Sequence, residues 1–186
     1  MIEDLLATAD FELSQLDGIA FGAGPGSFTG LRIACGVAQG LAFGVNIPVV
    51  PVGTLVALAQ EAGAGADKVI ACLDARMGEI YHAVYLRAGA SWKEVSAPGV
   101  GRAQSAPDVE GSGWFGCGSG FAAYADELAK RYAGQLSGVA AQLHPHARSI
   151  ARLAMPVLAS GGGLPAEQAA PVYIRDKVAL KMHEQR

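Results

Sequence analysis

The sequence predicts an α/β fold with at least one parallel connection between strands. Apolar segments short enough for buried strands, at 18–21 and 47–52, alternate with helical segments in the first third of the chain. A hairpin follows, and the composition shifts near Ala88. A chain of 186 residues is long enough for one large domain or two small ones. We place a domain boundary at the shift in composition. The expected lobes are 1–88 and 89–186, with the C-terminal tail free to pack back on the first lobe.

Local patterns predict the elements of the first lobe. Apolar residues recur at helical spacing in 1–9 (MIEDLLATA), and the run 47–52 (IPVVPV) carries two prolines that favour the margin of a sheet. Thr29 is expected to cap the helix that follows a glycine-rich loop. In chain order we predict helix 1–9, strand 18–21, loop 22–30, helix 29–44, strand 47–52 and helix 53–62.

The next segment of the chain predicts a β-hairpin. The apolar run 68–74 (KVIACLD) is followed by the turn 75–78 (ARMG) and by the alternating run 79–87 (EIYHAVYLR). Residues 88–112 are polar and contain Gly and Pro, so they receive no regular element. Downstream we predict a strand at 113–118, a helix at about 121–132, and a helix at 146–160 that Pro156 bends or ends.

The composition favours a chain with a protein partner. Hydrophobic residues make up 51% of the chain and charged residues only 17%, where an average domain has roughly 25%. A shortage of charge leaves apolar surface that a partner subunit is expected to cover. The net charge is −3 and no basic run stands out, which argues against nucleic-acid binding by this chain alone. The mildly basic segment 175–186 is interpreted as a solvated C-terminus.

Cysteine usage and hydropathy predict a cytoplasmic protein. The three cysteines, Cys35, Cys72 and Cys117, lie in apolar contexts without a C-x-x-C pair, as is typical of reduced thiols. The longest apolar run, 33–45, is shorter than the roughly 20 residues of a membrane span and follows Arg32. We therefore expect no membrane association.

The loop at 22–32 (GAGPGSFTGLR) resembles a phosphate-binding loop without meeting either common pattern. It lacks the lysine of a P-loop, and Thr29 stands where the dinucleotide fingerprint needs a third glycine. What remains is a helix N-terminus that can host an anion, or a tight turn at Pro25-Gly26 in which the glycine supplies a positive φ. The candidate anion contacts in this loop are Gly24, Gly26, Ser27 and Thr29.

Three glycines in the predicted helix 29–44 recur on one face. Gly36, Gly40 and Gly44 are spaced by four residues, and each costs a helix about 1 kcal/mol relative to alanine. Such a cost is typical of a helix whose backbone approaches another closely. The partner is either another subunit or the chain's own sheet, and the sequence leaves both open. The candidate interface residues are Leu31, Ile33, Gly36, Val37, Gly40, Leu41 and Gly44.

Other candidate chemistry is sparse. Asp74, Arg76 and Glu79 place two carboxylates and a guanidinium around one turn, which suits acid–base work or a structural ion pair lining a cleft. The histidines do not have the spacing of a metal-binding helix pair, and no His/Asp constellation points to the hydroxyls of Ser27 or Thr29.

Four stretches taken together resemble the bacterial TsaB (YeaZ) family. They are GAGPGSFTGLRIACGVAQGLAFG, IPVVPVGTLVALAQ, ACLDARMGEIYHAVY and PVYIRDKVALK, and their order and spacing match from about residue 16 onwards. The resemblance implies an α/β actin/Hsp70-like (ASKHA, ribonuclease H-like) fold of two lobes around a cleft. Family members begin with strands that carry an AIDT-like segment, which this sequence lacks. We therefore expect a first lobe truncated at its N-terminus.

The resemblance also implies a function. TsaB proteins are non-catalytic scaffolds that dimerise with TsaD, the subunit that transfers a threonylcarbamoyl group to the adenosine beside the anticodon of ANN-decoding tRNAs. The implied partners are a TsaD-like subunit, a TsaE-like P-loop ATPase, a second copy of this chain, and tRNA reached through the complex. No cofactor is expected on this chain alone, and ATP or ADP only in the complex. The alternatives are an enzyme of the same superfamily, as a glycoprotease-like peptidase or an ATPase, and a small-molecule kinase-like lobe.

Overall fold

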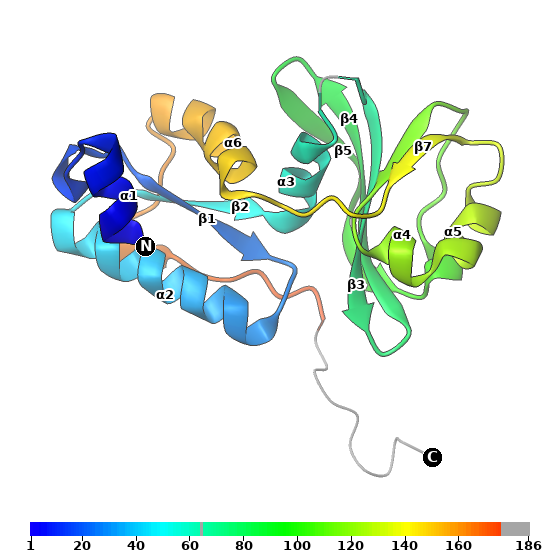
Figure 1. The fold of residues 1–186 in the computed structure, drawn as a ribbon, viewed down its shortest axis with the longest axis horizontal. Helices are drawn as coiled ribbons and strands as arrows, with labels where there is room; N and C mark the ends of the chain where they lie inside the picture. The colour runs from blue at the N-terminus through cyan, green and yellow to red at the C-terminus, as the bar shows by residue number, and fades with distance from the viewer. Residues whose placement is uncertain (64, 176–186) are drawn as a thin grey trace, which may run out of the picture.

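The computed structural model describes residues 1–63 and 65–175; most of the basic C-terminal segment therefore lies outside the described residues (Figure 1). The described helices are α1 (Ile2–Ala9), α2 (Phe28–Val45), α3 (Thr54–Glu61), α4 (Gly120–Ala123), α5 (Ala125–Arg131) and α6 (Ala147–Ala159), with 3₁₀ turns η1 (Leu13–Gln15), η2 (Ala103–Ser105) and η3 (Ala166–Gln168). The described strands are β1 (Ile19–Gly24), β2 (Val49–Gly53), β3 (Lys68–Arg76), β4 (Glu79–Ala88), β5 (Ser91–Gly101), β6 (Trp114–Cys117) and β7 (Leu136–Ala140).

The first sheet is small and has helices on both faces. β1 and β2 run parallel and are joined by α2, which confirms the predicted parallel connection. Side chains alternate along each strand, so β1 sends Phe21 and Ala23 towards α2, while β2 sends Val50 and Val52 towards α6. Beyond β1, β2 makes one antiparallel bridge, from Val49 to Leu164, in keeping with the margin position predicted from its prolines.

The second sheet holds the larger core. Its strand order is β5-β4-β3-β6-β7, with antiparallel pairing among β3, β4 and β5 and parallel pairing among β3, β6 and β7. One face packs on α4, α5 and η2 through residues such as Ile70, Trp114 and Leu128, and the other packs on α3 through Leu55 and Leu58. Helix α3 thus lies between the two sheets (Figure 1).

The end of the described chain returns to the first sheet. Helix α6 packs on β1, β2 and α3, and Ser149 on α6 donates a hydrogen bond to the Glu61 carboxylate at the end of α3. The Val172 amide donates to the Ala23 carbonyl of β1 at 2.7 Å. The predicted boundary at residue 88 falls between β4 and β5, which pair along most of their length. The division between the two sheets therefore does not coincide with the shift in composition at residue 88.

Several local predictions need correction. Residues 88–112, where no regular element was predicted, contain the long strand β5. The strand β7 was not predicted either. The helix expected at 121–132 is interrupted at Tyr124, where the backbone leaves helical geometry. Pro156 does not end α6, which continues through it to Ala159. Ser27, not Thr29, caps α2, since its hydroxyl accepts the Gly30 amide.

His82 on β4 gives the fold a pH-dependent element. Its ring covers Gly99 of β5, and a Cβ there would lie 2.7 Å from the ring. Burial lowers the pKa of the imidazole, and its Nδ1 has no partner among the described residues. The folded state therefore favours the neutral ring, and unfolding takes up a proton.

We expect the contribution of His82 to the free energy of unfolding to be complete above pH 6.5, the ordinary pKa of histidine, and to fall as the pH drops below that value. Urea unfolding at pH 7.5 and 5.5 measures the difference, which His82→Gln should reduce. The same change at exposed His146 is the control. An equal pH dependence in all three proteins would contradict this assignment.

Candidate functional site

Helix α2 buries one narrow side. Leu31, Cys35, Ala38 and Ala42 recur every three or four residues and pack towards β1. These four are the buried residues of an 18-residue helix. By length and hydropathy alone α2 is the one described helix that could cross a membrane. Its composition is thus that of a buried helix, although most of it faces outward.

The glycine face of α2, which we define as Ile33, Gly36, Val37, Gly40 and Gly44, points away from the sheet. All five residues are exposed, and no atom of the described residues lies within 4 Å of a Cβ placed on any of the three glycines. Ile33 is 62% and Val37 44% exposed, which is high for such side chains. Packing of these glycines on the chain's own sheet is therefore excluded.

Two of the proposed interface residues lie elsewhere on α2. Leu31 is buried, because its side chain packs under the loop at Gly24 and Gly26. Leu41 is half-buried at the edge of the helix. The sequence spacing grouped them with the glycines because both are apolar, but their positions around the helix turn them towards the protein.

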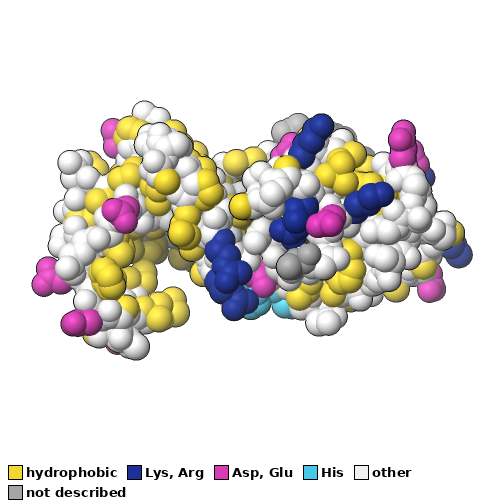
Figure 2. Space-filling model, turned by 90° about the horizontal axis from the view of Figure 1, so that it is seen from above, with side chains coloured by type: hydrophobic (Ala, Val, Ile, Leu, Met, Phe, Trp, Pro, Cys, Tyr) yellow, Lys and Arg dark blue, Asp and Glu magenta, His cyan; other side chains and the backbone are white. Residues whose placement is uncertain are grey.

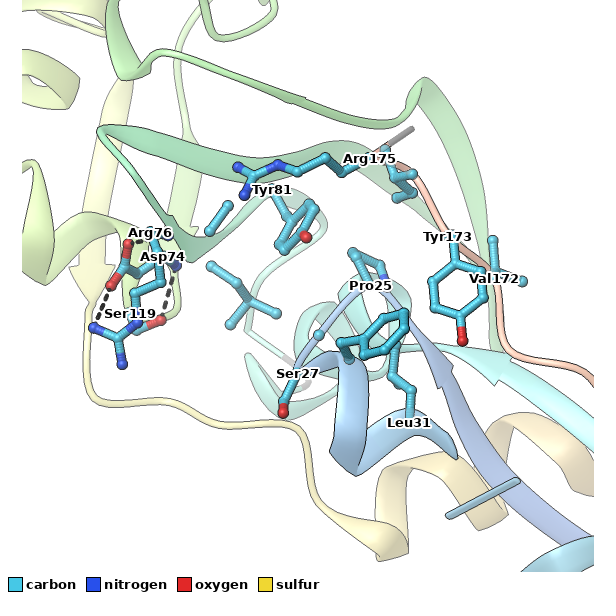
Figure 3. A pocket seen from close by; sticks show the side chains of 15 residues that line it. Pro25, Ser27, Leu31, Asp74, Arg76, Tyr81, Ser119, Val172, Tyr173 and Arg175 are labelled. Carbon is cyan, nitrogen blue, oxygen red and sulfur yellow. Dashed lines mark hydrogen bonds and ion pairs between the residues drawn. The ribbon is translucent and has the colours of Figure 1, made fainter. Parts of the chain in front are cut away.

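A cavity of about 500 Å³ lies between the N-terminal end of α2 and the second sheet (Figure 3). Five segments meet there: the loop and first turn of α2, the end of β3, Tyr81 of β4, Ser119 after β6, and the segment 172–175. Of the predicted cleft residues, Gly26, Ser27, Asp74 and Arg76 line it, whereas Gly24, Thr29 and Glu79 do not. Its size suits a small ligand, and its walls are mostly apolar.

The glycine-rich loop is shaped by contact with the chain itself. Gly24 has φ +121°, and a Cβ there would lie 2.6 Å from the Val172 carbonyl oxygen. The positive φ expected at Gly26 is thus found at Gly24. The turn predicted at Pro25-Gly26, with a positive φ at Gly26, is therefore not formed. The positive φ at Gly24 instead makes room for the returning C-terminal segment.

The β3–β4 turn holds its own charges. The Asp74 carboxylate accepts the Arg76 amide at 2.8 Å and pairs with the Arg76 guanidinium at 3.1 Å, as the dashed lines in Figure 3 mark. The Asp74 amide donates to the Ser119 hydroxyl at 3.1 Å. Arg76 and Met77 both have positive φ, which non-glycine residues rarely adopt. Asp74 therefore orders the turn at the rim of the cavity.

A short segment, Val172–Arg175, crosses from the first sheet to the second; we call it the strap. Val172 is bonded to β1, while the Arg175 guanidinium pairs with the Glu79 carboxylate and lies over the Tyr81 ring, 5.8 Å from its centre. Figure 3 shows Tyr173 and Arg175 along one side of the cavity. Sequence reasoning missed these residues and Ser119 because nothing local places them beside residues a hundred positions away.

Neutralising Glu79 should loosen the strap. In Glu79→Gln the ion pair with Arg175 is lost, and because Glu79 is partly exposed we expect a cost of only about 1 kcal/mol. Hydrogen exchange at the Val172 amide should then be roughly fivefold faster. Glu94→Gln, on the exposed side of β5, is the control. Unchanged exchange at Val172 would show that the ion pair does not hold the strap.

Few side chains in the described residues are free for chemistry. No group of three or more His, Cys, Asp or Glu that could hold a metal occurs in 1–63 and 65–175. Burial raises the pKa of the Cys117 thiol to about 12, and burial together with the nearby Cys117 raises that of Cys72. Neither thiol is a ready nucleophile.

Known proteins resemble this chain in sequence over nearly its whole length. The family model described as "TsaD: tRNA N6-adenosine threonylcarbamoyltransferase" matches residues 1–181. The chain is 37% identical to the tRNA threonylcarbamoyladenosine biosynthesis protein TsaB of Escherichia coli, over 97% of this chain and 80% of that protein. It is 35% identical to TsaB of Haemophilus influenzae, over 97% and 79% respectively.

The solved structures that resemble the chain carry the same fold. YeaZ from Pseudomonas aeruginosa has a TM-score of 0.83 and 40% identity, covering 93% of this chain and 80% of that one. A second structure, described as an uncharacterized protein with similarity to peptidase YEAZ from the same organism, has a TM-score of 0.85 and 40% identity over 94% and 81%. The fold is thus of the actin/Hsp70-like (ASKHA) type that the motifs predicted. On sequence and structure together, the chain belongs to the TsaB (YeaZ) family of tRNA threonylcarbamoyladenosine biosynthesis proteins.

Proposed function

We propose that this chain is the non-catalytic subunit of the complex that makes threonylcarbamoyladenosine in ANN-decoding tRNAs, and that it binds a TsaD-like catalytic subunit through the glycine face of α2. The observation that carries the proposal is that face: an uncharged strip of an 18-residue helix, exposed along its length. Glycines let two helix backbones approach closely, and the strip has no other cover among the described residues.

The cavity supports a scaffold over an enzyme. Its carboxylate, Asp74, is held by Arg76, and the neighbouring Glu79 is held by Arg175. Both carboxylates thus have structural roles, one in the β3–β4 turn and one in holding the strap. A peptidase or ATPase would instead show turnover by the purified chain, and that assay separates the two functions.

The remaining partners follow from the same assignment. A TsaE-like ATPase joins the complex, tRNA is reached through it, and a second copy of this chain uses the same α2 face in the absence of the TsaD-like subunit. ATP or ADP is held only by the complex, which works in the cytoplasm.

We assign the two lobes according to the two sheets. The first lobe contains β1, β2, α2 and α6, and the second contains β3 to β7.

Light scattering after size exclusion tests the proposal. The chain is run alone and mixed with the TsaD-like protein of the same organism, and a 1:1 complex is the expected result. A chain that stays monomeric and ignores that protein overturns the proposed partner. Measurable peptide or ATP hydrolysis by the chain alone would overturn the non-catalytic role.

A further inference from the structure

Arg32 is an isolated cation in an acidic part of the chain. It is the only lysine or arginine in residues 1–67, which contain the acidic residues Glu3, Asp4, Asp10, Glu12, Asp17, Glu61 and Asp67. It is also the only charged residue of α2. In the view from above, the first-lobe end at the left shows acidic side chains and no Lys or Arg (Figure 2). Arg32 is isolated in sequence as well, because residues 18–60 contain no other charged residue.

None of the described carboxylates pairs with Arg32. Its guanidinium is held by aromatic groups instead: it lies 3.8 Å from the centre of the Phe28 ring and 5.9 Å from that of Tyr173. Its Nε donates to the Tyr173 hydroxyl at 2.9 Å. Within the described residues, this is the one hydrogen bond of the Arg32 side chain, so both terminal nitrogens are unused.

This arrangement fixes the direction of the guanidinium. Stacking on aromatic rings and one hydrogen bond through Nε leave a planar pair of N–H groups that suits a carboxylate, and the side chain has already lost much of its rotamer freedom. Preorganisation lowers the entropy that binding must overcome. Arg and Tyr are also the residue types that most often dominate binding energy at interfaces.

Arg32 stands at the edge of the proposed docking surface. It precedes Ile33 and lies one helical turn before Gly36, so it borders the glycine face at the end nearest the cavity. The glycine face itself carries no charge that would set the orientation of a partner helix. A cation at one end of the face would fix the orientation in which the partner helix docks.

We propose that Arg32 receives a carboxylate of the TsaD-like subunit and so fixes the orientation of the helix that docks on α2. This rests on the proposed function. The partner surface is then a helix with small or apolar residues along the contact and an Asp or Glu at the end that meets Arg32. Tyr173 acts as a positioning residue, because it holds the guanidinium through Nε without meeting the partner's carboxylate.

The first test compares dissociation constants by calorimetry at 50 and 300 mM salt. Arg32→Gln is expected to bind the TsaD-like protein about tenfold to hundredfold more weakly at low salt and to lose most of the salt dependence. Tyr173→Phe, which keeps the ring and removes the acceptor, should weaken binding severalfold. Arg102→Gln, at an exposed arginine of the second lobe, is the control.

The second test identifies the carboxylate. Arg32→Lys places an amine at this position, and a zero-length carbodiimide should join it to an Asp or Glu of the TsaD-like protein, found by mass spectrometry. A cross-link only to acidic residues of this chain overturns the proposal, as does no cross-link from that amine. Wild-type affinity in Arg32→Gln overturns it while leaving the proposed function intact. Absence of binding by the unaltered chain overturns both.

Discussion

Replacing Gly40 with leucine is expected to weaken binding of the TsaD-like subunit by about tenfold to hundredfold while the isolated chain stays folded. In the part of the chain that the structure describes, no atom lies within 4 Å of a Cβ at Gly40, so this part accepts a larger side chain. In a close contact between helices, the added carbons would hold the two backbones apart. Overpacking costs about 1–3 kcal/mol, and 1.4 kcal/mol is a tenfold change in affinity. Calorimetric titration of the two purified proteins measures the change.

A leucine on another exposed helix provides the control. Ala129→Leu adds a similar side chain on α5 of the second lobe and should leave binding unchanged. The milder Gly40→Ala should raise the free energy of unfolding by about 1 kcal/mol, because alanine favours a helix more than glycine does, and should still weaken binding. If Gly40→Ala stabilises the chain but leaves the affinity unchanged, α2 is not part of the interface.

Gly118→Ala is expected to lower the free energy of unfolding by about 2–5 kcal/mol. Gly118 has φ +97°, and a Cβ there would overlap the Cys72 carbonyl oxygen and lie 2.5 Å from Leu58 Cδ2. A left-handed backbone costs a non-glycine residue about 1–2 kcal/mol, and the clash with a fixed backbone atom adds about 1–3 kcal/mol. Urea unfolding followed by circular dichroism measures the loss.

Gly134 separates the two causes. Its φ is +74°, but no atom of residues 1–63 and 65–175 lies within 4 Å of a Cβ there, so Gly134→Ala should cost only about 1–2 kcal/mol. Equal losses in the two variants would mean that the close packing at Gly118 does not matter. The position bears on the cavity, because Gly118 precedes Ser119, whose hydroxyl holds the Asp74 amide.

Local sequence signals predicted the regular core of this protein well. The hairpin at 68–87 is rich in apolar residues because both of its strands bury side chains on the two faces of the second sheet. The strand β5 was missed because it pairs with β4 alone and its pairing shifts register opposite His82 and Val84, which breaks the alternation. The short strand β7 also has mixed exposure and gave no apolar run.

The sequence by itself determined the α/β class, the parallel β1–α2–β2 unit, and a helix with glycines on one face. It did so because these depend on spacing within about twenty residues. Only the tertiary structure decided that this face points outward, since both sides of α2 are apolar after Arg32 and no charged residue follows it in the helix to mark one side as exposed. It alone also brought Ser27, Asp74, Ser119 and Arg175 around one cavity, because contacts between such distant segments depend on how the two sheets and the returning C-terminal segment pack.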